Sequence, residues 1–160
     1  MEAVVVKTTG NKYSVRTLDG KILMCMLKGK FRVKKIKSTS PIIVGDIVLI
    51  ELDGDNWMIV DLCERKNQII RKSVNLSKQT HVIAANIDQA ILMITLINPT
   101  TTTAFIDRFL VSANAYGVDV VLLFNKKDLY NNKLLQDQKY LMEGYKKIGY
   151  KVMSFSALND

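Results

Sequence analysis

The hydrophobic pattern of this 160-residue chain changes character at about Ile87, and this change limits the folds open to it. Up to about Arg71, short apolar or alternating runs are separated by turn residues, without a helical stripe of useful length. Beyond Ile87, nearly continuous apolar runs alternate with amphipathic segments of helical spacing. We therefore expect a β half followed by an α/β half.

Short strand patterns fill the first half, which is typical of a small closed barrel such as the five-stranded oligonucleotide-binding (OB) fold. Turn signals such as Asp19-Gly20 and Asp53-Gly54 divide these patterns. The expected strands are Ala3–Lys7, Tyr13–Leu18, Ile22–Leu27, Phe31–Ile36, Ile47–Leu52 and Trp57–Leu62.

The second half has the order β-α-β-α-β, which predicts a parallel sheet with right-handed crossovers. Threonines before the first helix supply N-caps, and Gly117 lies where a C-cap belongs. The expected elements are a strand at Ala90–Leu96, a helix at Thr102–Tyr116, a strand at Val118–Phe124, a helix at Asn132–Ile148 and a strand at Lys151–Phe155. Between the halves, Glu64–His81 is polar and basic, and we expect a linker or a partly strand-like connection.

Positive charge is concentrated in the first half of the chain. Residues 1–80 hold 15 Lys and Arg against 8 Asp and Glu, a net +7, whereas residues 81–160 hold 8 against 7, a net +1. Clustered positive charge favours a polyphosphate partner such as RNA; an anionic membrane surface and solubility alone are the alternatives.

Cysteine and histidine are scarce. Cys25 and Cys63 lie far apart without a C-x-x-C pattern, and His81 is the single histidine, so we predict no metal site. We expect both cysteines to be small buried hydrophobes. Free thiols, with neither a signal peptide nor an apolar run approaching 18 residues, predict a soluble cytoplasmic protein.

An N-K-x-D tetrapeptide, Asn125-Lys126-Lys127-Asp128, follows the apolar strand that ends at Phe124. Ligands of open α/β sheets bind at the carboxyl ends of the strands. The Asp128 carboxylate can accept from both the ring N–H and the exocyclic amino group of guanine, a pair of donors that adenine lacks. Asn125 can stitch the loop and reach the acceptor edge of the purine, and the aliphatic stem of Lys126 can cover the base.

A small-residue turn, Ser156-Ala157, follows the next strand of the predicted sheet. A backbone N–H of this turn can meet the guanine carbonyl oxygen where a larger side chain would obstruct it. The turn supports the guanine interpretation because it ends the strand beside the N-K-x-D loop. The predicted guanine-binding residues are therefore Asn125, Lys126, Asp128, Ser156 and Ala157, with GTP or GDP as ligand.

The phosphate-cradling sequence G-x-x-x-x-G-K-S/T is missing. Gly20-Lys21 and Gly29-Lys30 lack both the leading glycine and the trailing Ser or Thr. Either the chain cannot hold a triphosphate, or a circularly permuted phosphate-binding half follows beyond Asp160. We identify no catalytic residue in this fragment and predict that it is inactive alone.

The sequence resembles the ribosome small-subunit-dependent GTPases, the RsgA or YjeQ family, over essentially its whole length. The matching segments, in family order, are Lys28-Gly29-Lys30-Phe31-Arg32, Val44-Gly45-Asp46-Ile47-Val48, Glu64-Arg65-Lys66-Asn67, Arg71, Ala84-Ala85-Asn86-Ile87-Asp88-Gln89, Phe105-Ile106-Asp107-Arg108-Phe109-Leu110, Asn125-Lys126-Lys127-Asp128-Leu129 and Ser156-Ala157.

This resemblance implies an OB-fold-like RNA-binding barrel at 1–71, a connection at 72–86, and the first part of a circularly permuted P-loop-GTPase-type α/β domain at 87–160. It implies a role in maturation of the small ribosomal subunit. We also expect contact with the rRNA of that subunit, a cytoplasmic monomer, and no association with membrane or DNA. Mg²⁺ and a structural Zn²⁺, in a C-terminal domain, are expected in the complete protein only.

A basic strand pattern supplies most of the predicted RNA contacts. Lys28, Lys30, Arg32 and Lys34 alternate with small or apolar residues, so a strand would project four cations on one face. Together with Lys35, Arg65 and Arg71 they are the predicted RNA-binding residues. The alternative is an edge strand protected by lysines against aggregation.

Two other classes of protein stay open at this point. A non-enzymatic RNA-binding OB module with a degenerate α/β partner would make the N-K-x-D sequence accidental, and it predicts RNA affinity without purine preference. A flavodoxin-like enzyme domain is disfavoured, because no glycine-rich phosphate loop follows any predicted strand.

Overall fold

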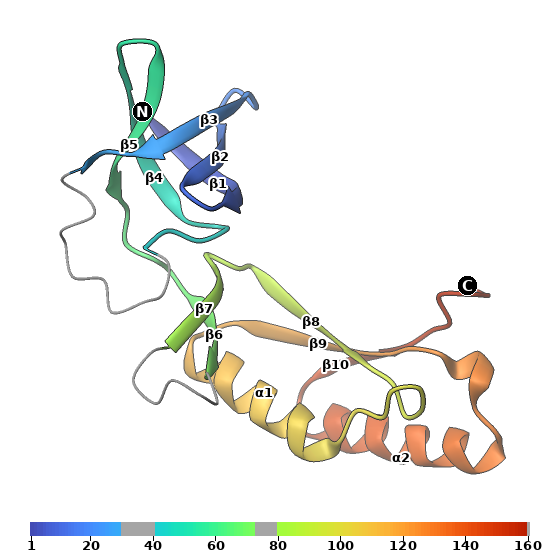
Figure 1. Cartoon of the computed structure of the whole chain (residues 1–160). Helices are drawn as coiled ribbons and strands as arrows, with labels where there is room; N and C mark the ends of the chain where they lie inside the picture. The colour runs from blue at the N-terminus through green and yellow to red at the C-terminus, as the bar shows by residue number, and fades with distance from the viewer. Residues whose placement is uncertain (30–40, 73–79, 160) are drawn as a thin grey trace. The chain divides into compact units, whose positions relative to one another are not determined.

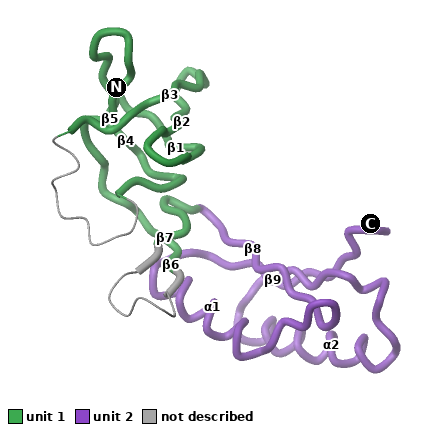
Figure 2. Tube along the Cα trace, in the orientation of Figure 1, with its two compact units in different colours: residues 1–87 green, residues 88–160 purple. Residues whose placement is uncertain are grey.

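The computed structural model describes residues 1–29, 41–72 and 80–159. It divides into two compact units, Met1–Ile87 and Asp88–Asp160 (Figure 2). The division falls where the hydrophobic period changes in the sequence. It differs from the expected end of the first domain at residue 71, because a further pair of strands belongs to the first unit.

Five strands of the first unit close into a barrel in the order β1-β2-β3-β5-β4 (Figure 1). Neighbouring strands are antiparallel except β3 and β5, which are parallel. The predicted barrel is confirmed, while the expected strand Phe31–Ile36 lies outside the described residues. The strands are β1 (Glu2–Thr9), β2 (Lys12–Thr17), β3 (Ile22–Leu27), β4 (Ile47–Asp53) and β5 (Asn56–Leu62).

Alternating side chains of these strands fill the barrel. Val5, Val15, Cys25 and Ile59 have no exposed surface. Burial raises the pKa of the Cys25 thiol to about 11, as expected for a cysteine that serves as a small core residue. The second cysteine, Cys63, is only partly buried.

Two more strands, β6 (Gln68–Lys72) and β7 (Thr80–Ala85), pair as an antiparallel two-stranded sheet within the first unit. Val82 and Ala85 are buried against Ile43, a residue of the loop that precedes β4. The segment 72–86, which we expected to be a linker or connection, therefore includes β7 and contributes its own apolar contacts to the first unit.

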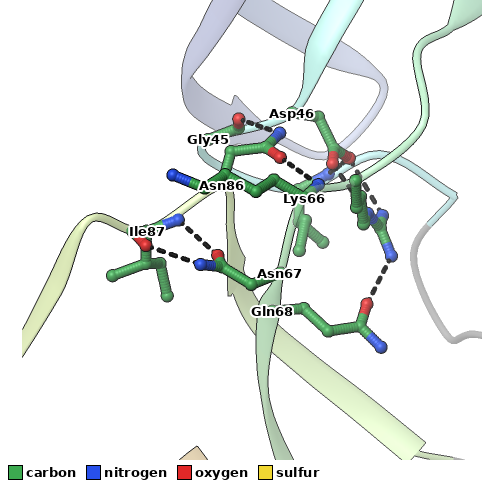
Figure 3. A network of polar contacts seen from close by, with 9 residues as sticks. Gly45, Asp46, Lys66, Asn67, Gln68, Asn86 and Ile87 are labelled. Atoms are coloured by element: carbon green, nitrogen blue, oxygen red, sulfur yellow. Dashed lines mark hydrogen bonds and ion pairs between the residues drawn. The ribbon is translucent and has the colours of Figure 1, made fainter. Parts of the chain in front are cut away.

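A polar network, which we call the joint, ties this strand pair to the barrel (Figure 3). The Asp46 carboxylate accepts from Nε and Nη2 of Arg65 at 2.7 and 3.0 Å, and from the Ile43 N–H at 2.9 Å. Asn86 donates to the Gly45 carbonyl at 2.9 Å and accepts from the Lys66 N–H at 2.8 Å.

Gly45 is the tightest point of the joint. Its φ is +91°, and a Cβ on this residue would lie 2.0 Å from the carbonyl oxygen of Ala85. Its own N–H donates to the Val5 carbonyl of β1 at 2.8 Å. Only glycine fits this backbone conformation and this close approach between the turn before β4 and the end of β7.

The second unit is a three-stranded parallel sheet with the order β10-β9-β8. Both helices lie on one face of it (Figure 1). The predicted β-α-β-α-β order is confirmed, and a 3₁₀ turn is added at Lys127–Leu129. The elements are β8 (Gln89–Ile94), α1 (Thr103–Ala115), β9 (Asp119–Phe124), α2 (Asn132–Lys147) and β10 (Lys151–Ser154).

Local sequence explains where the helices begin and end. The Thr102 hydroxyl caps α1 by accepting from the Phe105 N–H at 3.3 Å, and Asn131 caps α2 by accepting from the Leu134 N–H at 2.9 Å. Gly117, with a φ of +66°, follows α1. The two helices are joined by Tyr145, whose hydroxyl donates to Asp107 at 2.8 Å.

Strand β8 alternates strictly between buried and exposed residues. Leu92 and Ile94 are buried, whereas Ile91 and Met93 expose more than half of their surface, as does Met153 of β10. The apolar residues on the exposed face are consistent with helices that cover one face only. No helix in the described part of the chain is long and apolar enough to cross a membrane.

Candidate guanine-nucleotide site

The two predicted guanine motifs follow neighbouring strands and therefore lie side by side. Strands β9 and β10 pair in parallel with Phe124 opposite Ser154, and the Phe155 N–H donates to the Phe124 carbonyl at 2.9 Å. Asn125 begins one loop and Ser156 begins the next at the same edge of the sheet. This is the edge where open α/β sheets bind ligands.

Asn125 stitches the two loops together. Its side chain is buried, and Oδ1 accepts from the Lys126 N–H at 2.6 Å and from the Ala157 N–H at 3.1 Å. The stitching role predicted for Asn125 therefore appears in the geometry. The Ala157 N–H is engaged by this contact, and the next N–H, of Leu158, makes only a long 3.4 Å contact with the Ser156 hydroxyl.

Asp128 is held in place but stays accessible. It lies in the 3₁₀ turn Lys127–Leu129, and the fully buried Ser156 hydroxyl donates to its Oδ1 at 2.5 Å. The residue itself is exposed. A carboxylate can accept about four hydrogen bonds. An oriented, exposed carboxylate thus has acceptor capacity left for the two donors of a guanine edge.

Lys126 adopts a left-handed backbone conformation, with a φ of 64°. Its Nζ contacts the carbonyl oxygen of Asn98, which also has a positive φ, of 50°. Such conformations are unfavourable for residues other than glycine and cluster at functional sites. The structure brings Lys126 to the same edge of the sheet, and the covering of the base by its stem stays a prediction.

Two contributors to this edge escaped the sequence analysis. The first is the segment after β8, residues 95–101, whose two ends are joined by a hydrogen bond from the Thr101 N–H to the Thr95 carbonyl at 2.7 Å. The hydroxyl of the buried Tyr130 donates to the Asn125 carbonyl at 2.7 Å and accepts from the Leu96 N–H at 2.9 Å. Its signal in the sequence is an aromatic residue two positions after the motif, since a buried tyrosine hydroxyl needs hydrogen-bond partners.

A separate cavity of about 300 Å³ opens at the other edge of the same sheet. It is lined by the first residues of the three strands, Gln89, Asp119 and Lys151, over the apolar Val118 and Val120. Because parallel strands place their amino ends together, this cavity is distinct from the guanine motifs.

The predicted RNA-binding residues differ in their exposure and in their contacts. Lys28 is exposed, with Nζ 3.5 Å from Asp53, whereas Arg65 is committed to the joint by contacts with Asp46 and with Gln68 at 3.1 Å. This geometry favours a structural role for Arg65. Arg71 lies in β6, but its side chain is outside the described part of the chain, as are Lys30, Arg32, Lys34 and Lys35 entirely.

Models of two protein-family domains match the chain, and together they cover both units. The model of the RsgA GTPase matches residues 62–160, and that of the RsgA N-terminal domain matches residues 2–60. The chain belongs to the RsgA GTPase family. Two solved structures are similar over 98% of the chain. One is YjeQ from Thermotoga maritima, with a TM-score of 0.75 and 33% identity, and the other is YloQ, described as a circularly permuted GTPase, with a TM-score of 0.71 and 30% identity. The chain covers 52% of each of them.

Curated RsgA relatives have the name small ribosomal subunit biogenesis GTPase RsgA. That of Flavobacterium johnsoniae is 53% identical over 164 residues, which cover all of this chain and 50% of the relative. That of Christiangramia forsetii is 53% identical over 163 residues, which cover 99% of this chain and 52% of the relative. The chain thus spans about half the length of the RsgA relatives it matches.

Proposed function

We propose that the complete protein is a GTPase that binds the small ribosomal subunit during its maturation and hydrolyses GTP there. This chain supplies guanine recognition, through Asn125, Lys126, Asp128, Ser156 and Ala157, and a basic barrel for rRNA. The observation that carries the proposal is the exposed Asp128 carboxylate, held by the buried Ser156 at a strand-end edge. The names of the RsgA relatives support the ribosomal part.

The acceptors that Asp128 offers fit guanine better than adenine. Asp128 offers only acceptors, and guanine presents two adjacent donors where adenine has none in that arrangement. A site built in this way rejects a base without those donors, because its own polar groups would be left unpaired.

Phosphate binding and hydrolysis belong to residues beyond this chain, which has no P-loop sequence. Mg²⁺ would neutralise the phosphates, and a structural Zn²⁺ would stabilise a further domain of the complete protein. In the ranges that the structure describes, no group of three or more His, Cys, Asp or Glu side chains is placed to hold a metal ion.

Binding to rRNA is proposed for the barrel, with exposed Lys28 as one contact. The net +7 of residues 1–80 supports it, since phosphate contacts dominate nucleic-acid affinity. We also propose that the complete protein is cytoplasmic and monomeric, and that it associates with neither membrane nor DNA.

The test is GTP hydrolysis by the full-length protein, with and without purified small ribosomal subunits, and with ATP as the control nucleotide. Subunits should stimulate the turnover of GTP and leave ATP untouched. Absence of turnover under every condition would refute the GTPase and leave a basic RNA-binding module as the better account.

A further inference from the structure

The N-K-x-D loop is fastened at its start by a residue outside the motif. The Asn125 carbonyl accepts from the Tyr130 hydroxyl at 2.7 Å, so the phenol spans the loop from its last residue back to its first. Tyr130 is 8% exposed, which keeps water from competing for this contact. The loop between these two residues contains Asp128.

The same hydroxyl ties the loop to a second strand end. It accepts from the Leu96 N–H at 2.9 Å, two residues beyond the end of β8. On the other side of the loop, Lys126 contacts the Asn98 carbonyl in the same segment. Two independent contacts therefore hold the N-K-x-D loop against residues 95–101.

We propose that Tyr130 is a positioning residue for guanine recognition, which fixes the Asp128 loop through its hydroxyl without touching the base. A loop that is already ordered loses less conformational entropy when it binds a ligand. The benefit is largest for a ligand that uses both acceptor sites of the carboxylate, because both contacts require one fixed orientation.

The test compares two nucleotides that differ only at that edge of the base. Inosine diphosphate (IDP) lacks the exocyclic amino group of GDP and can make only one of the two contacts with Asp128. Affinities of the full-length protein for both nucleotides are measured by calorimetry, for the unaltered protein and for Tyr130→Phe, which keeps the ring and removes the hydroxyl.

Tyr145→Phe is the matched control. Tyr145 is also 8% exposed and its hydroxyl also donates a hydrogen bond in the second unit, but to Asp107 of α1. Tyr130→Phe should lower the affinity for GDP about ten-fold and the affinity for IDP about two-fold. The ratio of the two affinities, which is the preference for GDP, should therefore fall about five-fold. Tyr145→Phe should leave the preference unchanged.

Replacement of Tyr130 by 4-aminophenylalanine, which restores a donor at the same place, should recover most of the preference. An unchanged preference for GDP in Tyr130→Phe would overturn the proposal, as would a folded 4-aminophenylalanine variant that fails to recover it. The role of Tyr130 rests on the proposed guanine site, and the unaltered protein separates the two: if it does not prefer GDP to IDP, the site itself is refuted.

Discussion

The joint of the first unit and the strand-end loops of the second unit are both dense in polar side chains. They differ in how much hydrogen-bonding capacity these side chains leave unused. In the joint, Asp46 is fully buried and its carboxylate is satisfied by Arg65 and the Ile43 N–H. In the loops, Asn125 and Ser156 are buried and satisfied, whereas Asp128 is held by one contact and exposed.

This is the difference that we expect between a structural polar cluster and the proposed binding site. Buried polar groups that satisfy one another fix the local structure and have nothing left for a ligand. A site instead needs a buried supporting layer and an exposed acceptor. We therefore expect substitutions in the joint to change the free energy of unfolding, and substitutions in the loops to change nucleotide affinity.

The largest effect on stability should come from Gly45→Ala. The added Cβ would lie 2.0 Å from the Ala85 carbonyl oxygen in a backbone conformation with a φ of +91°, so the strand pair must move away from the barrel. We expect a loss of about 4 kcal/mol in the free energy of unfolding, measured by denaturant titration. Gly10→Ala, at a φ of +60° with nothing within 4 Å of the added Cβ, should lose only about 1 kcal/mol. Equal losses would show that the close approach is not the cause.

Arg65→Ala should have the next largest effect. It leaves the fully buried Asp46 carboxylate without its ion-pair partner, at an expected loss of about 3 kcal/mol in the free energy of unfolding. Lys21→Ala is the control, because it removes the pair of Lys21 with Asp19 at a mostly exposed site and should change nothing measurable. Reduced rRNA affinity in Arg65→Ala without a loss of stability would instead place Arg65 on the RNA-binding surface.

Ser156→Ala should affect nucleotide binding more than folding. The variant loses the contact that orients Asp128, so GDP affinity should fall about ten-fold, while the free energy of unfolding changes by about 1 kcal/mol or less. Ser154→Ala, two residues earlier, removes only a contact with Gln138 of α2 and should leave GDP affinity unchanged. Loss of stability without loss of affinity would make Ser156 part of a structural cluster, like the joint.

Much of the fold was predictable because local periodicity decides it. Alternating runs predicted the barrel strands, and apolar runs separated by capped helices predicted the parallel sheet. The pair β6 and β7 was expected only as a linker or partly strand-like connection. Its attachment depends on contacts across 19 to 41 residues, such as Arg65 with Asp46 and Asn86 with Gly45, which a polar sequence segment does not reveal.

The residues of the proposed guanine site could be placed together from the sequence because the carboxyl ends of parallel strands share one edge of the sheet, so that two short motifs point to a single location. Arg65 was grouped with the RNA-binding residues because charge alone does not show whether a cation has an internal partner. Tyr130 was missed for a related reason, since its role depends on the Leu96 N–H, 34 residues away in the sequence.

The most direct test of the guanine site is the base preference of Asp128→Asn in the full-length protein, measured as the affinities for GDP and xanthosine diphosphate. The new amide donor matches the xanthine carbonyl and opposes the guanine amino group. GDP affinity should therefore fall by about 100-fold or more, and xanthosine diphosphate should become the preferred ligand. Asp119→Asn, at the opposite edge of the sheet, is the control and should keep the original preference. Unaltered GDP affinity in Asp128→Asn would contradict the account.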